Sequence, residues 1–314
     1  MFSKYIDNSK NTVDEYLSMN EILENILSYN EWLEIDTDPQ TNQPLRYEVE
    51  KVFDENRVVS IKGTDFQFNY IKYSYDSLLS GQETNPIATE RLKTTHGGFV
   101  IYTDGLRTQY LMDKARGPQS LRVLRKVNNS DKNKIIEAES FNINEEFFIW
   151  LLSRFMNDNK VLDDNNDLTI SRIIGFKGEG NPNEKEAVLS GSGNEVMNLI
   201  SSISFLIEMQ SMTEIEVRVV IEDETYEIRY FSRNSQIDIM VENYSGQFML
   251  DVREEKVSKI LLKAFIEIIP SMMNSFNEDV ENGEWTNNSK RDFTLALVDS
   301  VRNKLDSMYG LENE

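Results

Sequence analysis

The sequence predicts an α+β fold in which mixed or antiparallel sheets and amphipathic helices form two subdomains. Short β-type runs follow one another with brief connections, and apolar residues repeat with helical spacing in separate stretches. A polar, acidic run over 157–167 separates the two halves. We therefore expect an N-terminal α+β subdomain with β-hairpins and a basic segment over 1–157. A C-terminal antiparallel sheet with helices is expected over 168–314.

The N-terminal half is expected to begin with an amphipathic helix over 12–33. Thr12 and Glu15 have the spacing of a capping box, in which each side chain accepts from a backbone N–H of the first turn. Two prolines within 36–44 end this helix. Strand-like runs follow over 45–53, 57–62 and 65–73, the last two joined around Gly63. The stretch 78–93 is expected to be a loop with one helical turn.

The pair Asp104-Gly105 lies between two β-rich runs and predicts a type I′ hairpin, because glycine adopts positive φ without steric cost. Gly117-Pro118 predicts the start of a short helix to about Val127, since a first-turn N–H has no partner to lose. A further strand is expected over 135–141. Asn144 is expected to cap a helix that buries the aromatic and aliphatic run from 147 to 155.

The C-terminal half is expected to hold an antiparallel meander, because the runs 214–222, 225–231 and 236–242 have short connections and alternating apolar residues. Two paired strands precede it, over 168–177 and 186–190, followed by a helix from Ser192 to about 210. Helical spacing over 257–272 predicts a long amphipathic helix. A last helix is expected from a Ser289 cap to Gly310, with these residues facing inward: Phe293, Leu297, Val298, Val301, Leu305 and Met308.

Acidic side chains dominate the chain: 54 Asp and Glu residues outnumber 33 Lys and Arg residues, and the net charge is −21. Such a field repels nucleic acid and anionic membranes. The absence of Cys excludes thiolate nucleophiles and Cys-ligated metals. The longest apolar run, 147–152, is too short to cross a bilayer, and the start lacks the apolar core of a secretory signal. We expect a cytoplasmic protein with no membrane partner.

No pattern that carries chemistry is complete, so we predict no catalytic residue, no cofactor and no metal ligand. His96 is the only histidine, and a general-base role is one interpretation, but no Gly-x-Ser-x-Gly elbow accompanies it. We expect His96 in a loop just before a strand. The Gly-rich stretch 190–194 lacks the lysine of a phosphate-binding loop and has acidic flanks, so helix capping explains it.

Two groups of carboxylates are candidate cation sites. The run 163–167 fails as a calcium loop, because its sixth and twelfth positions are Leu168 and Ile174 instead of Gly and Glu. We expect a solvated linker there. The carboxylates between 214 and 227 crowd one hairpin and resemble the acidic residues of a metal-dependent nuclease, but Glu214 and Glu216 share the polar strand face that any wet sheet presents.

The segment 107–134 departs from the acidic background, because it holds eight cations and two acids. Helical spacing places Arg122, Arg125 and Lys126 on one face. Such a strip can bind phosphates or an acidic surface of a protein. The competing interpretation is that these cations pair with the chain's own Glu and Asp. The candidate binding residues are these: Arg107, Lys114, Arg116, Arg122, Arg125 and Lys126.

From these observations we expect a non-enzymatic protein-interaction or regulatory component. The Asn-, Ile- and Glu-rich composition without Cys resembles that of low-GC bacteria and their phages, which points to an accessory system such as phage defence or counter-defence. A protein partner or self-association is expected, and nucleic acid only through 107–134. One alternative is a divalent-metal-dependent enzyme acting on nucleic acid or nucleotides, with Glu216 or Asp104 near the ion. A further alternative is an acidic nucleic-acid mimic.

Overall fold

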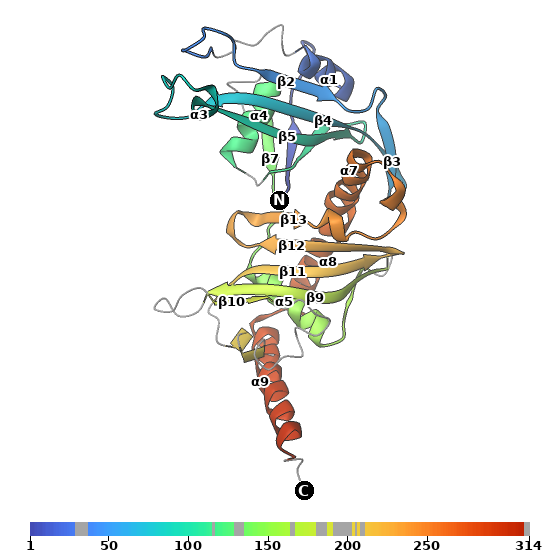
Figure 1. Cartoon of the computed structure of the whole chain (residues 1–314). Helices are drawn as coiled ribbons and strands as arrows, with labels where there is room; N and C mark the ends of the chain where they lie inside the picture. Colours follow the sequence, from blue (N-terminus) through green and yellow to red (C-terminus); the bar gives the residue numbers. More distant parts are fainter. Residues whose placement is uncertain are drawn as a thin grey trace. The chain divides into compact units, whose positions relative to one another are not determined.

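The protein has an α+β fold with two antiparallel sheets, and all strand pairs in the described residues are antiparallel (Figure 1). The computed structural model describes residues 1–28, 37–114, 117–128, 135–163, 167–179, 187–190, 203–204, 206–207 and 211–310. The contacts divide the chain into two compact units: unit 1 is 1–140 with 251–262, and unit 2 is 141–250 with 263–314. The composition-based division and this contact-based division differ in where they assign the helix over 145–156 and the segment 251–262.

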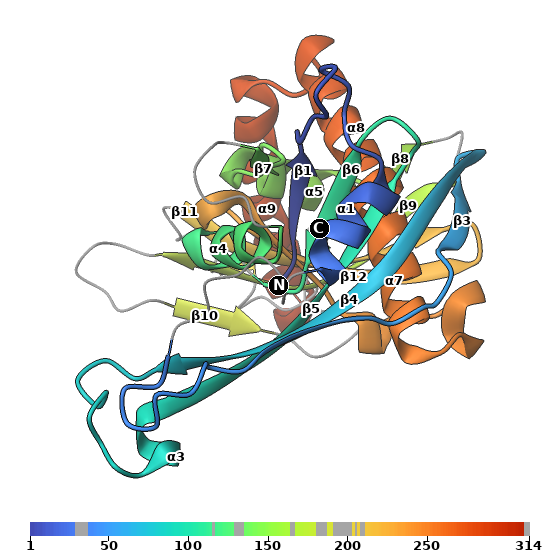
Figure 2. The ribbon, with the colours of Figure 1, turned by 90° about the horizontal axis from the view of Figure 1, so that it is seen from above.

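Unit 1 is built on a sheet with the strand order β2-β4-β5-β6-β1-β7, in which β3 also pairs with β4. Strands β4 and β5 are long, and their far ends extend from the sheet to the short helix α3 (Figure 2). The bounds are β1 Ser3–Asp7, β2 Tyr47–Lys51, β3 Arg57–Ile61, β4 Thr64–Leu78, α3 Ala88–Arg91, β5 Leu92–Thr103, β6 Thr108–Met112 and β7 Ile136–Glu139.

Helices α1 (Met19–Leu27) and α4 (Pro118–Val127) cover one face of this sheet. In α4, Val123, Leu124 and Val127 are buried in the core against sheet residues such as Ile71 and Phe99. Gly117-Pro118 starts α4 as predicted. The other face of the sheet contacts helix α7 (Arg253–Lys263), where Lys72 forms an ion pair with Glu254.

The predicted start of the first helix is wrong. Helix α1 begins at Met19, where Ser18 and Glu21 form the capping box, and Asp14 adopts a left-handed φ of 68° that a helix excludes. Positions 29–33 of the prediction lie outside the described residues. The Ser18 box is followed by an apolar stripe that buries Ile22 and Leu23, whereas Val13 is exposed. Burial of that stripe therefore decides which of two similar capping patterns starts the helix.

The hairpin around Asp104-Gly105 exists, but its turn is not type I′. Thr103 pairs with Thr108, so four residues form the connection, and of these only Gly105 has positive φ. The Asp104 carboxylate accepts from the backbone N–H groups of Leu106 and Arg107 and stabilises the longer loop. The two-residue turn with two positive φ angles is instead Lys62-Gly63, between the paired residues Ile61 and Thr64.

We expect Gly63→Ala to destabilise unit 1 by about 1 kcal/mol, because an L residue is strained at the φ of 73° found there. A Cβ at this position meets no atom within 4 Å, so the cost is purely a backbone cost. Urea denaturation followed by circular dichroism measures it. Gly63→Asn is the control and should cost less, since Asn tolerates left-handed backbone. Equal losses for Ala and Asn would contradict this explanation.

Unit 2 is built on a sheet with the order β10-β9-β11-β12-β13, in which β8 also pairs with β9 (Figure 1). The predicted meander is confirmed, and residues alternate between buried and partly exposed along β11. β8 lies inside the polar run 157–167 that was expected to separate the two halves, and it overlaps the expected linker 163–167 only at Asp163. The bounds are β8 Val161–Asp163, β9 Leu168–Glu179, β10 Ala187–Ser190, β11 Ser211–Ile221, β12 Glu224–Phe231 and β13 Gln236–Ile239.

Two helices pack their aromatic side chains against this sheet. Helix α5 (Glu145–Met156) is capped by Asn144 as predicted, and its Phe147 ring lies 5.5 Å from Tyr230 of the sheet and 5.6 Å from Phe276 of α8. Helix α8 (Ile269–Glu281) follows α7 through a π-helical turn, Ala264–Ile268. This turn interrupts the regular α-helix that the spacing over 257–272 predicts.

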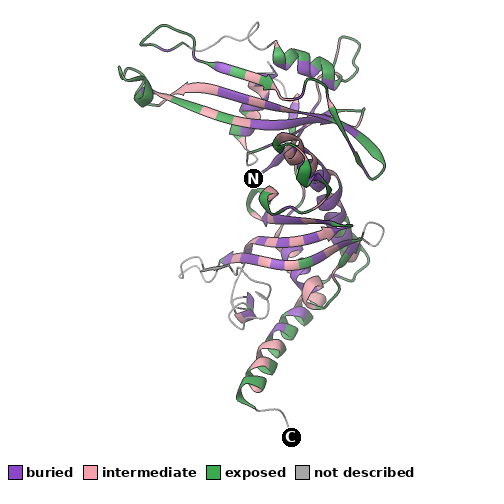
Figure 3. Cartoon of the chain, turned by 45° about the vertical axis from the view of Figure 1, so that its right-hand side comes forward, coloured by how far each residue is buried: buried purple, intermediate pink, exposed green. Residues whose placement is uncertain are grey.

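Helix α9 (Asn287–Tyr309) is only partly buried, and its cap differs from the predicted one. Thr286 is the N-cap, and Ser289 is the third helical residue of the capping box. Phe293 and Leu297 are buried, but Val298, Leu305 and Met308, which were expected to face inward, are exposed. Figure 3 shows the change from buried to exposed residues along the helix. Gly310 ends α9 with a left-handed φ of 64°, as expected.

In the part of the chain that the structure describes, no helix is both long enough and apolar enough to span a bilayer. The predicted helix from Ser192 to 210 falls almost entirely outside the described residues.

Candidate functional site: a basic cavity beside a tyrosine ladder

Cross-strand pairing in unit 1 assembles a ladder of three tyrosines, Tyr47, Tyr75 and Tyr73. Tyr47 of β2 lies opposite Tyr75 of β4, and their ring centroids are 5.7 Å apart at an interplanar angle of 17°. Tyr73 precedes Tyr75 by two residues on the same face, and their rings stack at 6.2 Å. Because β5 continues the sheet, Ser77 pairs with Lys93, which places Lys93 on this face beyond the ladder.

A cavity of about 940 Å³ opens beside this ladder. Its lining includes four cations, one histidine and one acid, together with polar residues such as Thr95 and Gln119. Arg122 and Lys126 come from consecutive turns of α4, Lys114 follows β6, and Lys93 comes from β5. We call this feature the basic cavity and define it by these four cations. Its one acid, Asp76, already accepts a hydrogen bond of 2.6 Å from Thr94.

Two of the four cations of the basic cavity, Lys126 and Lys114, contact aromatic rings. The Lys126 ammonium lies 5.1 Å from the centroid of Tyr47 and 5.8 Å from that of Tyr75, and the Lys114 ammonium lies 6.0 Å from Tyr73. None of the four cations forms an ion pair with an acidic side chain that the structure describes. A ring face compensates an ammonium only in part, so these cations retain their capacity to bind an anion.

The predicted binding residues divide into three groups. Lys114, Arg122 and Lys126 line the basic cavity. Arg107 lies apart from it, where it donates to Asn8 and to the Tyr16 hydroxyl and stacks 4.3 Å from the Tyr16 ring. Arg125 is half-buried on α4 and does not line the cavity, and its Nε has no partner among the described residues. Arg116, together with Lys132 and Lys134, lies outside the described residues.

The sequence prediction missed Lys93 and the tyrosines, because sheet pairing brings them to α4 from distant positions. A usable signal was present: Tyr73 and Tyr75 alternate in a strand, and aromatic residues two apart share a face. The prediction that His96 lies in a loop is wrong, since it lies within β5. His96 is exposed and lines both the basic cavity and a second one.

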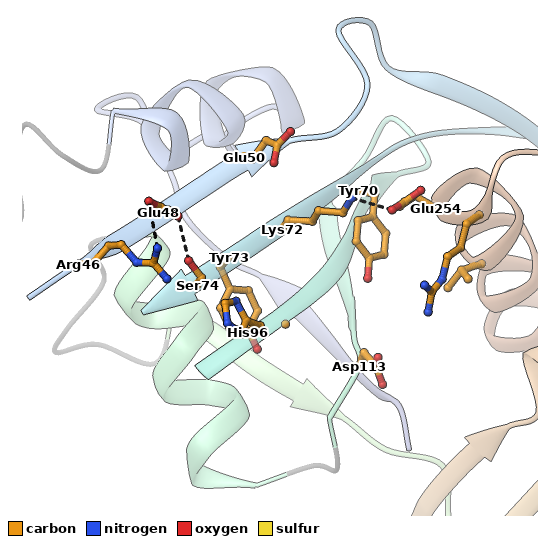
Figure 4. Close-up of a pocket in the computed structure, with 13 residues that line it drawn as sticks. Arg46, Glu48, Glu50, Tyr70, Lys72, Tyr73, Ser74, His96, Asp113 and Glu254 are labelled. Carbon is orange, nitrogen blue, oxygen red and sulfur yellow. Dashed lines mark hydrogen bonds and ion pairs between the residues drawn. The ribbon is translucent and has the colours of Figure 1, made fainter. Parts of the chain in front are cut away.

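The second cavity lies on the opposite face of the same sheet, beside α7, and its charges are largely paired (Figure 4). The Lys72 ammonium lies 2.6 Å from the Glu254 carboxylate, and Arg46 lies 3.8 Å from Glu48, which also accepts from Ser74. The ammonium of Lys72 holds the pKa of Glu254 below its ordinary value. Burial, aided by nearby acidic charges, raises the pKa of Tyr70 to about 12, so its hydroxyl is neutral at pH 7. This cavity thus satisfies much of its own charge.

The carboxylates between 214 and 227, which resemble those of a metal-dependent nuclease, include three that form cross-strand ion pairs in unit 2. Glu216 pairs with Arg229 at 2.5 Å, and Glu214 pairs with Lys177 at 2.9 Å. Glu227 pairs with Arg218. A carboxylate whose charge is compensated in this way is a poor ligand for a divalent cation.

Glu224 belongs to a buried polar network in unit 2. Its carboxylate accepts from the hydroxyls of Tyr226 and Tyr244, from the Gln247 amide and from the Lys263 ammonium at 2.7 Å. Burial opposes its ionisation most strongly, but the hydrogen bonds together outweigh burial and leave the pKa of Glu224 below its ordinary value. The network joins β12 to the segment 241–250 and to the start of the π-helical turn.

Within the described ranges, no three His, Asp or Glu side chains are grouped in a way that could hold a metal ion. No protein-family model matches the chain, and no curated protein matches its sequence.

Proposed function

We propose that this chain is a non-enzymatic protein-interaction or regulatory component that binds an anionic partner through the basic cavity of unit 1. The observation that carries the proposal is that none of the four cations forms an ion pair with an acidic residue that the structure describes. In a chain with 54 acidic and 33 basic residues, a basic side chain readily finds an acidic neighbour. Four cations that gather around one cavity without a described acidic partner therefore favour a role outside the chain.

Electrostatic complementarity gives such a cavity selectivity as well as attraction. The net negative charge of the chain opposes anionic partners in general, whereas the basic cavity attracts them, so a partner is oriented as it approaches. On composition, we place this component in a bacterial or phage accessory system, such as phage defence or counter-defence. The paired state of Glu214, Glu216 and Glu227 weighs against both the metal-dependent enzyme and the acidic mimic, since each needs free carboxylates.

A labelled peptide of ten glutamates is the probe that tests anion binding. We expect fluorescence anisotropy to show binding that weakens as sodium chloride rises from about 50 to about 200 mM, because screening shortens the reach of the cavity's field. Arg122→Glu combined with Lys126→Glu should weaken binding by at least about tenfold, which corresponds to roughly 1.4 kcal/mol. The matched control reverses two cations of unit 2, the partly exposed Lys160 and the exposed Arg302, to Glu and should bind like the unaltered chain.

The proposal fails if the unaltered chain binds neither this peptide nor a multiply charged phosphate compound, or if the two double variants bind the peptide equally. Incubation with magnesium or manganese and DNA, RNA or nucleotides tests the non-enzymatic part, and any turnover would overturn it. Salt-sensitive binding to a basic DNA-binding protein that survives the Arg122 and Lys126 reversals would favour the acidic mimic instead.

A further inference from the structure

We propose that the ligand of the basic cavity is a compact small molecule that carries two or more phosphate groups. This inference rests on the proposed function and names the chemical class of the anion. The argument uses the charge of the cavity, its size and the kinds of donor that line it.

The charge of the cavity requires more than one anionic group. Four cations and a single acid line it, and that acid is already hydrogen-bonded to Thr94. Each phosphate carries a charge of about −1.5 to −2 at pH 7 and presents three acceptor oxygens, so two phosphates match the excess positive charge. Carboxylates bring one charge each, so three of them are needed to match the same charge.

The volume of about 940 Å³ lies within the range of small-molecule sites and admits one compact ligand. A nucleic-acid strand fits less well, because its phosphates continue past the cavity and the chain as a whole carries a net charge of −21. Because the positive charge is concentrated at the cavity and the chain is acidic overall, the cavity favours a ligand small enough to keep all its negative charge inside it.

The donors are arranged for phosphate oxygens. Arg122 presents a planar fork that can bind two oxygens of one phosphate, while Lys126 on the next turn of α4, Lys114 after β6 and Lys93 of β5 supply point charges. Lys114 and Lys126 are half-buried and lie against the tyrosine ladder, which limits their hydration and strengthens binding to an anion. Gln119 and Thr95 add neutral hydrogen-bonding groups to the same cavity.

Isothermal titration calorimetry of the full chain tests the inference with sodium tripolyphosphate, ATP and a single-stranded DNA of twelve nucleotides, all without divalent cations. We expect tripolyphosphate and ATP to bind with one ligand per chain. Tighter binding of ATP would show that the nucleoside also contacts the cavity, and equal binding would assign the affinity to the phosphates; both results support the proposal. Binding of the DNA alone would overturn it in favour of a nucleic-acid surface.

Two variants locate the site. Arg122→Gln and Lys126→Gln should each raise the Kd for tripolyphosphate by about tenfold, because each removes a charge-assisted hydrogen bond. Arg107→Gln is the matched control, since it removes a cation of the same sequence segment that lies outside the basic cavity, and it should leave Kd within about twofold. If the glutamate peptide binds but neither phosphate compound does, this inference fails while the proposed function stands. If none of the three binds, both fail.

Discussion

Replacing Lys263 with methionine is expected to destabilise unit 2 by about 3–5 kcal/mol, because it leaves the buried carboxylate of Glu224 without its cation. The side chains of Lys263 and Glu224 are only 7% and 4% exposed, and their charged atoms are 2.7 Å apart. Methionine keeps the length and volume of the aliphatic part of lysine, so the loss arises from the missing charge and not from a cavity. The two tyrosine hydroxyls and the Gln247 amide still donate to Glu224, but they carry no charge.

The effect should be measured at pH 7, where both groups are ionised. The pKa of Glu224 lies below its ordinary value of 4.5, so its contribution to stability is present above pH 4.5 and is lost as pH falls through the lower, folded value. The pKa of Lys263 lies above its ordinary value of 10.5. Burial alone would lower this pKa, but the hydrogen bond to Glu224 and the charge of Glu224 outweigh burial and raise it. Its contribution is present below pH 10.5 and is lost as pH rises through the folded value.

Urea denaturation followed by tryptophan fluorescence suits this measurement, because Trp150 and Trp285 both lie in unit 2. Glu222→Gln is the matched control: Glu222 also contacts Lys263, at 3.3 Å, but it is 68% exposed and should change stability by less than about 1 kcal/mol. Adding Glu224→Gln to Lys263→Met should recover part of the loss, since the uncompensated charge is then absent. If Lys263→Met lowers the free energy of unfolding by no more than Glu222→Gln does, the buried ion pair of Lys263 and Glu224 does not stabilise unit 2 more than an exposed contact does.

Local signals in the sequence predicted the elements whose ends depend on a few neighbouring residues. Asn144 caps α5 and Gly117-Pro118 starts α4, because a side-chain acceptor or a fixed φ acts within one turn. Thr12 with Glu15 has the same spacing as Ser18 with Glu21, and only the burial of the following stripe separates them. Likewise Asp104-Gly105 and Lys62-Gly63 compete as hairpin turns, and the pairing register of the strands decides between them.

Three of the four cations of the basic cavity could be predicted from charge alone. The excess of cations over 107–134 drew attention to Lys114, Arg122 and Lys126, which line the basic cavity. Nothing in the sequence ties them to Lys93 or to Tyr47, because those contacts depend on the registers of β2 with β4 and of β4 with β5. Whether a cation has an acidic neighbour is also a property of tertiary structure, so charge along the sequence does not distinguish internal pairing from a free surface.

The tyrosine ladder constrains the backbone beneath it, and this constraint predicts a large effect of one added methyl group. Gly97 lies directly opposite Tyr73 in the register of β4 and β5, and a Cβ at Gly97 would clash with the ring carbons and the hydroxyl of Tyr73. Tyr73 is 3% exposed and is held between Tyr75 at 6.2 Å and Phe99 at 6.3 Å. The ring therefore has little room to move away.

We expect Gly97→Ala to destabilise unit 1 by about 3 kcal/mol, the upper part of the usual cost of overpacking a core. Urea denaturation measures the loss, and hydrogen exchange of the β4 and β5 amides should locate it. Gly98→Ala is the matched control: its Cβ would clash with the hydroxyl and the ring of Tyr70, but Tyr70 is only half-buried, so we expect its ring to shift and the cost to be clearly smaller. Because displacement of Tyr73 also disturbs the rings that Lys126 and Lys114 contact, Gly97→Ala should weaken anion binding while Gly98→Ala leaves it unchanged. Equal losses of stability and binding in the two variants would mean that the ladder does not fix the geometry of the basic cavity.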